Sequence, residues 1–243
     1  MQAPADRAPD CRWRECSNRS LADFIAPKDS GVADYIGMFA VTTGLGINKK
    51  EKQFEADNDD YSAIMLKALA DLFAEAFAEA LHARVRRELW GYVPGETLDN
   101  TAMIEEKYRG IRPAPGYPAC PNHLVKQDMF DVLQANEIGM TVTESLAMLP
   151  AASVSGFYIA HPESTYFSVG KIADDQVENF AQRMAISKND AERALAPLLR
   201  ESQRRNIGEV SYGYFDFPYT RRDAKAVMAA ATHSFNRHGE SRK

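Results

Sequence analysis

The fold is decided by YSAIMLKALADLFAEAFAEALHARVRRELW, residues 61–90. The stretch contains no glycine or proline, and alanine, the strongest helix former, is abundant in it. Apolar residues recur at spacings of three and four and so form one stripe along a helix: Met65, Leu69, Leu72, Phe73, Ala76, Ala80 and Leu81. The pattern predicts one long helix from about Tyr61 to Trp90.

The same stretch carries an acidic row, Asp71, Glu75 and Glu79. Side chains four residues apart lie on one face of a helix. The simpler interpretation is a solvated face, and the alternative is a surface that docks another protein module.

The remaining pattern mixes short helices and strands. We expect strands near 21–25, 34–41, 140–145, 153–159 and 166–172, and helices near 101–108, 126–136, 175–184 and from Ser187 onward. Because the two types do not alternate strictly, an α+β fold is favoured over a doubly wound sheet. We expect a polar leader at 1–20, one domain at 21–199, and a tail at 200–243 outside the core.

The composition excludes several classes of protein. The 243 residues include 29 basic and 34 acidic side chains, and the net charge of -5 argues against binding to nucleic acid. No apolar run approaches the roughly 20 residues that span a bilayer, and the start lacks the apolar core of a signal peptide. We therefore expect a cytoplasmic protein without membrane contact. Cys11, Cys16 and Cys120 lack paired CxxC spacing, which favours inert thiols and no metal site.

A proline-rich segment, RPAPGYPACP at 112–121, is the best candidate for a binding site. Prolines preset an extended backbone, and Gly116 allows close approach or a positive φ. The guanidinium of Arg112 can bind both oxygens of a carboxylate, and Tyr117 adds an aromatic ring. These features predict a rigid rim that binds a small anionic or zwitterionic ligand. The alternative is a structural loop with Arg112 in a surface ion pair.

The segment GIRPAPGYP at 110–118 is similar to the signature of the activation domain of vitamin B12-dependent methionine synthase. Further segments resemble this family in order and spacing: 22–27, 34–37, 39–41, 74–79, 143–145, 147–148, 153–156 and 166–167. The resemblance covers roughly 21–199. It implies a helix-flanked, largely antiparallel twisted sheet with a long central helix, unlike the Rossmann fold.

The resemblance also implies a function. The family's activation domain binds S-adenosylmethionine and supplies its methyl group for the reductive remethylation of cob(II)alamin, a methyltransferase reaction. A cobalamin-binding module, in cis or in trans, would carry the corrinoid, because the chain contains no Asp-x-His-x-x-Gly motif. A flavodoxin-like protein or a flavoprotein reductase would supply the electron.

Carried over by resemblance, the ligand contacts fall on Asp34, Arg112, Tyr166 and Phe167, with Ala114, Gly116 and Tyr117 beside them and Glu75 and Glu106 as further candidates. Arg112 would pair with the carboxylate of the ligand, and an acidic group would take its ammonium or a ribose hydroxyl. Aromatic rings would flank the purine and the sulfonium. Adjacent residues of a strand face opposite sides, so Tyr166 or Phe167 is expected in the core. The alternative for Asp34 is a turn or cap role.

Two other functions stay open at this point. One is a module that binds S-adenosylmethionine and docks a corrinoid protein without productive chemistry. The other is a structural interaction domain in which the proline loop is scaffolding.

Overall fold

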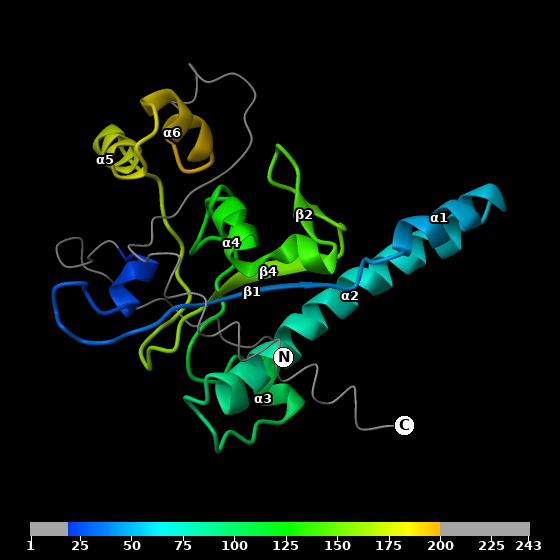
Figure 1. Ribbon diagram of the computed structural model, residues 1–243, viewed down its shortest axis with the longest axis horizontal. Helices are drawn as coiled ribbons and strands as arrows, with labels where there is room; N and C mark the ends of the chain where they lie inside the picture. The colour runs from blue at the N-terminus through cyan, green and yellow to red at the C-terminus, as the bar shows by residue number, and fades with distance from the viewer. Residues whose placement is uncertain (1–18, 200–243) are drawn as a thin grey trace, which may run out of the picture.

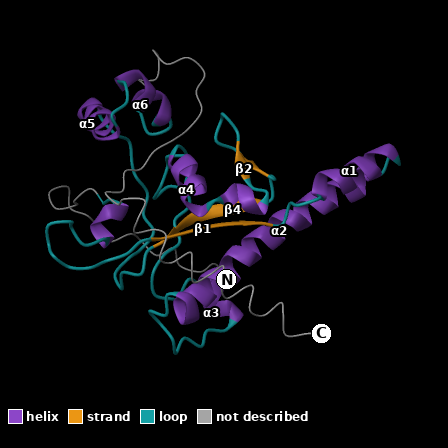
Figure 2. Ribbon diagram, in the orientation of Figure 1, coloured by secondary structure: helices purple, strands orange, loops and turns teal. Residues whose placement is uncertain are grey.

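The structure is a computed structural model that describes residues 19–199 (Figure 1, Figure 2). Apart from residues 19 and 20, the predicted leader and the predicted tail lie outside the described residues. The elements in chain order are η1 (Leu21–Phe24), β1 (Gly37–Thr42), α1 (Ile47–Ala56), α2 (Asp60–Arg84), η2 (Val85–Leu89), α3 (Asn100–Ile104), α4 (Val125–Leu133), η3 (Ala135–Ile138), β2 (Thr141–Val142), β3 (Met148–Leu149), β4 (Ser153–Tyr158), α5 (Asp174–Met184) and α6 (Lys188–Ala194).

A two-stranded antiparallel ribbon of β1 and β4 lies between α2 and α4 (Figure 2). Side chains alternate between the two faces of a strand. Phe39 and Val41 of β1 therefore pack with Ala78 of α2 on one face. Phe157 of β4 packs with Met129 of α4 on the other face. The fold class is α+β with antiparallel pairing, as predicted.

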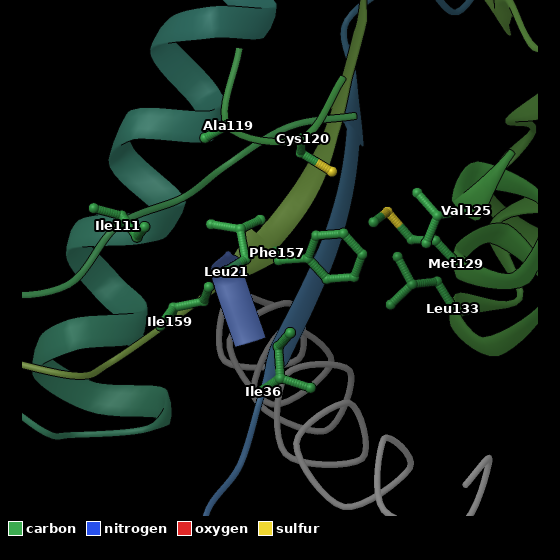
Figure 3. Close-up of a cluster of buried hydrophobic side chains, with 10 residues drawn as sticks. All are labelled: Leu21, Ile36, Ile111, Ala119, Cys120, Val125, Met129, Leu133, Phe157 and Ile159. Atoms are coloured by element: carbon green, nitrogen blue, oxygen red, sulfur yellow. The ribbon is translucent and has the colours of Figure 1, made fainter. Parts of the chain in front are cut away.

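The main core lies beneath the proline-rich segment (Figure 3). Ala119 and Cys120 enter it from that segment, Ile111 enters from the position just before it, and Leu21 enters from η1. All four are at most 3% exposed. The proline-rich segment is thus anchored in the core at both ends, which leaves the residues between as a rim.

The long helix is confirmed. It begins after Asp59, whose carboxylate accepts a hydrogen bond from the Ser62 amide at 3.0 Å, and α2 continues into η2, one π-helical turn. Its buried residues are small or polar ones: Ala63, Ala70, Ala74, Ala78, His82 and Ala83. The members of the predicted apolar stripe between Met65 and Phe73 are exposed instead. Alanine lets the helix backbone come close to the ribbon, so the alanine face is the one that packs.

Several predicted strands were wrong. Residues 21–24 form a 3-10 helix, because the Ser20 hydroxyl caps the Ala22 amide and the Asp23 carboxylate accepts from the Ser20 amide. The segment 166–172 contains no regular strand and forms only a parallel bridge from Ile172. The strand expected at 140–145 is reduced to the two residues of β2.

The predicted helices vary in accuracy. The helix expected at 101–108 ends at Ile104, and Glu106 adopts a positive φ of 54°. The helix expected at 126–136 is split at Gln134, which has a φ of 51°. The pair α5 and α6 is as predicted, with the Ser187 hydroxyl accepting from the Asp190 amide at 3.1 Å. This pair lies apart from the ribbon of β1 and β4 (Figure 1) and has its own small core.

Candidate functional site

Arg112 lies where the proline-rich segment runs beside β4. Ile111 and Ile159 exchange two backbone hydrogen bonds of 3.0 Å, and the Phe157 amide donates to the Pro113 carbonyl at 2.9 Å. Ile111 and Pro113 are buried on one side of this short stretch. The Arg112 side chain between them reaches Glu79 of α2.

The turn after Arg112 requires glycine at position 116. The Tyr117 amide donates to the Ala114 carbonyl at 3.2 Å, and the Gly116 amide donates to the Cys120 carbonyl at 2.7 Å. Gly116 has a φ of +101°, and a Cβ there would lie 2.2 Å from the His123 ring. A side chain is therefore excluded both by the backbone and by the neighbouring ring. Tyr117 at the tip of the turn is 60% exposed.

The Arg112 guanidinium is held on one edge. Its Nη1 lies 2.6 Å from the Glu79 carboxylate and donates to the Tyr108 hydroxyl at 3.0 Å. Burial lowers the pKa of Arg112, but Tyr108 and Glu79 outweigh burial and the net shift is upward. Among the described residues, Nε and Nη2 make no hydrogen bond, so the second edge of the fork can receive a carboxylate.

A buried polar cluster lies beneath this ion pair, built on successive turns of α2 and η2. His82 stacks on Tyr158, with ring centroids 5.0 Å apart, and meets Tyr108 edge-on at 5.0 Å. Burial, Arg86 and Arg112 together lower the pKa of His82 to about 2, so the ring is neutral at physiological pH. Arg86 lies 4.1 Å from the Tyr108 ring centroid and donates three hydrogen bonds of 2.7–2.9 Å to Glu96.

Four buried polar atoms of this cluster have no hydrogen-bond partner within the described part of the chain. They are Glu79 Oε1, His82 Nδ1, Arg86 Nη1 and the Tyr158 hydroxyl. Folded proteins pair nearly all buried polar atoms, and exceptions concentrate at functional sites. The buried cluster beneath Arg112, which we call the floor of the site, contains such a concentration of unpaired polar atoms.

Tyr166 is brought next to Arg112. Its hydroxyl accepts a hydrogen bond from the Arg112 amide at 3.1 Å, and the Val169 amide donates to the Pro118 carbonyl at 3.0 Å. The segment from Tyr166 to Val169 therefore lies along the proline-rich rim. Burial raises the pKa of Tyr166, whose side chain is still partly exposed. Phe167 instead packs on the main core, with its ring 6.4 Å from that of Phe24.

The three predicted acidic groups occupy different environments. Both oxygens of Asp34 accept backbone hydrogen bonds, from Ala26 at 2.9 Å and from Tyr35 at 2.8 Å, which is the turn role that the sequence left open. Glu75 is exposed on α2, one turn before Glu79. Glu106 is exposed. Burial is the main cause of the raised pKa of Tyr108 and of Tyr166, and the charge of Glu106 adds to it.

Two residues of the candidate site, Glu79 and Tyr108, were not assigned from the sequence. Asp71 and Glu75 of the acidic row are exposed, as expected of a solvated face, but Glu79 is half-buried against Arg112. Tyr108 stands only four residues before Arg112, which is the signal that the sequence did contain.

Between residues 19 and 199, no group of three or more His, Cys, Asp or Glu side chains could hold a metal ion. Cys120 is buried, and burial raises the pKa of its thiol to about 12, so the thiol is protonated. The described helices include none with the length and apolarity to cross a membrane. Cys11 and Cys16 lie outside the described residues.

Comparison with known proteins identifies the family. Residues 7–185 match the family model for the vitamin B12 dependent methionine synthase activation domain. The solved structure of a MetH reactivation domain bound to AdoHcy is similar to this chain, with a TM-score of 0.72 and 57% sequence identity. The match covers 74% of this chain and 55% of that chain, so this chain spans about half of the solved relative. The chain belongs to the activation-domain family of vitamin B12-dependent methionine synthases.

Proposed function

We propose that this chain binds S-adenosylmethionine at the Arg112 site and serves as the methyl-donor module for reactivation of a cobalamin held elsewhere. The observation that carries the proposal is that the 57% identical MetH reactivation domain was solved bound to AdoHcy. AdoHcy is S-adenosylmethionine without the transferable methyl group. The family match over residues 7–185 points the same way.

The geometry of Arg112 suits the carboxylate end of this ligand. Glu79 and Tyr108 fix the Nη1 edge, and the Nε and Nη2 edge is left for the two carboxylate oxygens. A guanidinium that is already oriented loses less conformational entropy when it binds. Glu79 and Tyr108 are thus positioning residues for Arg112.

The rest of the ligand would lie along the proline-rich rim. Tyr166 and Tyr117 present partly exposed rings there, which can flank the sulfonium and the purine. Glu106 and Glu75 are exposed carboxylates available for the ammonium or the ribose. Asp34 is a weaker candidate because its two oxygens already hold the 26–35 loop. Phe167 would support Tyr166 from the core rather than touch the ligand.

The chemistry asked of the chain is positioning. In reactivation, cob(II)alamin gains one electron and the methyl group of S-adenosylmethionine, giving methylcobalamin and S-adenosylhomocysteine. No proton is transferred, so the site needs no general base, and its contribution is to hold the donor in line with the metal. The corrinoid module and the flavodoxin-like or flavoprotein electron donor would be partners.

Two measurements test the proposal. Titration of the full chain with S-adenosylmethionine in a calorimeter should give saturable heat at one site, and absence of heat from well-folded protein would contradict the proposal. The second uses methyl-labelled S-adenosylmethionine, a reductant and a cob(II)alamin-loaded methionine synthase module. Label on cobalt supports a methyl donor, whereas saturable binding without transfer would indicate a module that only binds and docks.

A further inference from the structure

Among the described residues, α2 carries a largely exposed apolar face, most of it in the half of the helix that is far from Arg112. Seven large apolar side chains on this helix are 40–75% exposed: Tyr61, Ile64, Met65, Leu69, Leu72, Phe73 and Phe77. They follow one another at helical spacing, and this end of α2 reaches away from the ribbon (Figure 1). Contiguous apolar surface of this kind marks an interaction site in soluble proteins.

The apolar face is hollowed where it meets the end of β1. A cavity of about 540 Å³ is lined by Thr43 and Ile47 on one side and by Leu66, Leu69, Phe73 and Phe77 of α2 on the other. Thr43 directly follows β1, and its hydroxyl donates to the Ala70 carbonyl at 2.6 Å. The apolar face is therefore joined to the end of the ribbon.

The ribbon has a free edge along β1. The Phe157 amide of β4 points away from β1 and donates to the Pro113 carbonyl. Phe157 and Met38 therefore form a non-hydrogen-bonded pair, in which the amide and carbonyl of Met38 point away from β4. The same alternation applies to Ala40 and Thr42. Within residues 19–199 the amides of these three residues make no backbone hydrogen bond. An open strand edge is a template for another strand.

We propose that the apolar face of α2 and the free edge of β1 together bind a polypeptide segment that completes the activation domain, a strand added to β1 with apolar side chains laid on α2. The edge selects a polypeptide, because only a backbone can pair with Met38, Ala40 and Thr42. The solved relative supplies the candidate, since this chain matches 55% of it and nearly half of that polypeptide is unmatched. Exposed Asp71 and Glu75 beside the face disfavour an anionic membrane. The inference does not depend on the ligand proposal.

The test is complementation. The full chain is co-expressed with a tagged fragment that comprises the part of the MetH reactivation domain outside the match. We expect a one-to-one complex, in which the Met38, Ala40 and Thr42 amides exchange with deuterium at least about tenfold more slowly than in the chain alone.

The variant Leu72→Glu with Phe73→Glu should weaken the complex at least about tenfold, because it places two charges in the apolar contact while glutamate preserves the helix. Ile104→Glu is the matched control, an apolar side chain 82% exposed on α3 whose change should leave the complex intact. Three results would overturn the proposal: no complex although the chain is folded, a complex that the double variant binds equally well, or a dimer of the chain that the double variant dissociates.

Discussion

The two ends of α2 belong to one uninterrupted helix and differ in almost everything that surrounds them. At the end that continues into η2, Ala78, His82 and Arg86 are fully buried, and a buried charge network lies against Arg112. At the other end, Leu72 and Phe73 are 68% and 64% exposed. Local helix propensity is enough to form both ends. The first end packs on the ribbon and the buried charge network and carries the candidate site, whereas the other end packs mainly on α1 and leaves large apolar side chains exposed.

The largest expected effect is at the buried end. Glu96→Ala should destabilise the chain by about 3–5 kcal/mol, because it leaves Arg86 as an unpaired buried charge. Urea unfolding followed by circular dichroism measures this loss. The matched control is Glu51→Ala, which breaks the more exposed Lys67–Glu51 pair near the other end and should leave the midpoint unchanged. Equal losses of unfolding free energy in the two variants would contradict the proposed difference between the two ends of α2.

Protonation of His82 should give a smaller effect that depends on pH. The folded chain keeps this ring neutral down to a pKa of about 2, whereas the unfolded chain protonates it near pH 6.5. The unfolded state therefore binds more protons between these values, and stability should fall by about 1.4 kcal/mol for each pH unit below 6.5.

Unfolding of the wild type and of His82→Phe at pH 6.5, 5.75 and 5.0 isolates this contribution, because the acidic groups are common to both proteins. The variant should show the shallower pH dependence. Parallel pH profiles would mean that His82 is not buried as a neutral ring.

The smallest expected effect is at the exposed end. Ile64→Lys should change the unfolding free energy of the chain alone by no more than about 0.5 kcal/mol, because Ile64 is 62% exposed. Thermal or urea unfolding checks this. A loss of several times that size would show that the apolar face is covered within the chain itself.

The sequence correctly predicted that α2 is a long helix, but not which of its faces is buried. The alanine content and the absence of glycine and proline determined the helix from Asp60 onward. The periodicity of apolar residues shows which of them share a face of the helix, but not which face is buried. The alanine face is the buried one, because its small side chains allow close packing against Phe39 and Val41. The 3-10 helix at Leu21–Phe24 was missed because its apolar residues resemble a short strand and the Ser20 cap outweighed them.

The candidate site was predictable in its rim and not in its floor. The prolines and Gly116 identified a rigid turn, and the resemblance identified Arg112 and Tyr166, which the structure joins by a hydrogen bond. The Glu79–Arg112 pair spans 33 positions of sequence and depends on how α2 crosses the ribbon. No local pattern encodes that crossing, so Glu79 was grouped with the solvated residues of its helix.

The most direct test of the central claim is calorimetric titration of S-adenosylmethionine into Arg112→Ala beside the wild type, with Arg109→Ala as the control. Arg109 is an exposed neighbour that donates to the Ala160 carbonyl and is not assigned to the ligand. We predict that Arg112→Ala weakens binding about 10- to 150-fold, the cost of one charged hydrogen-bonded pair, while Arg109→Ala binds like the wild type. Equal affinity of Arg112→Ala and the wild type would contradict the assignment of this arginine to the ligand.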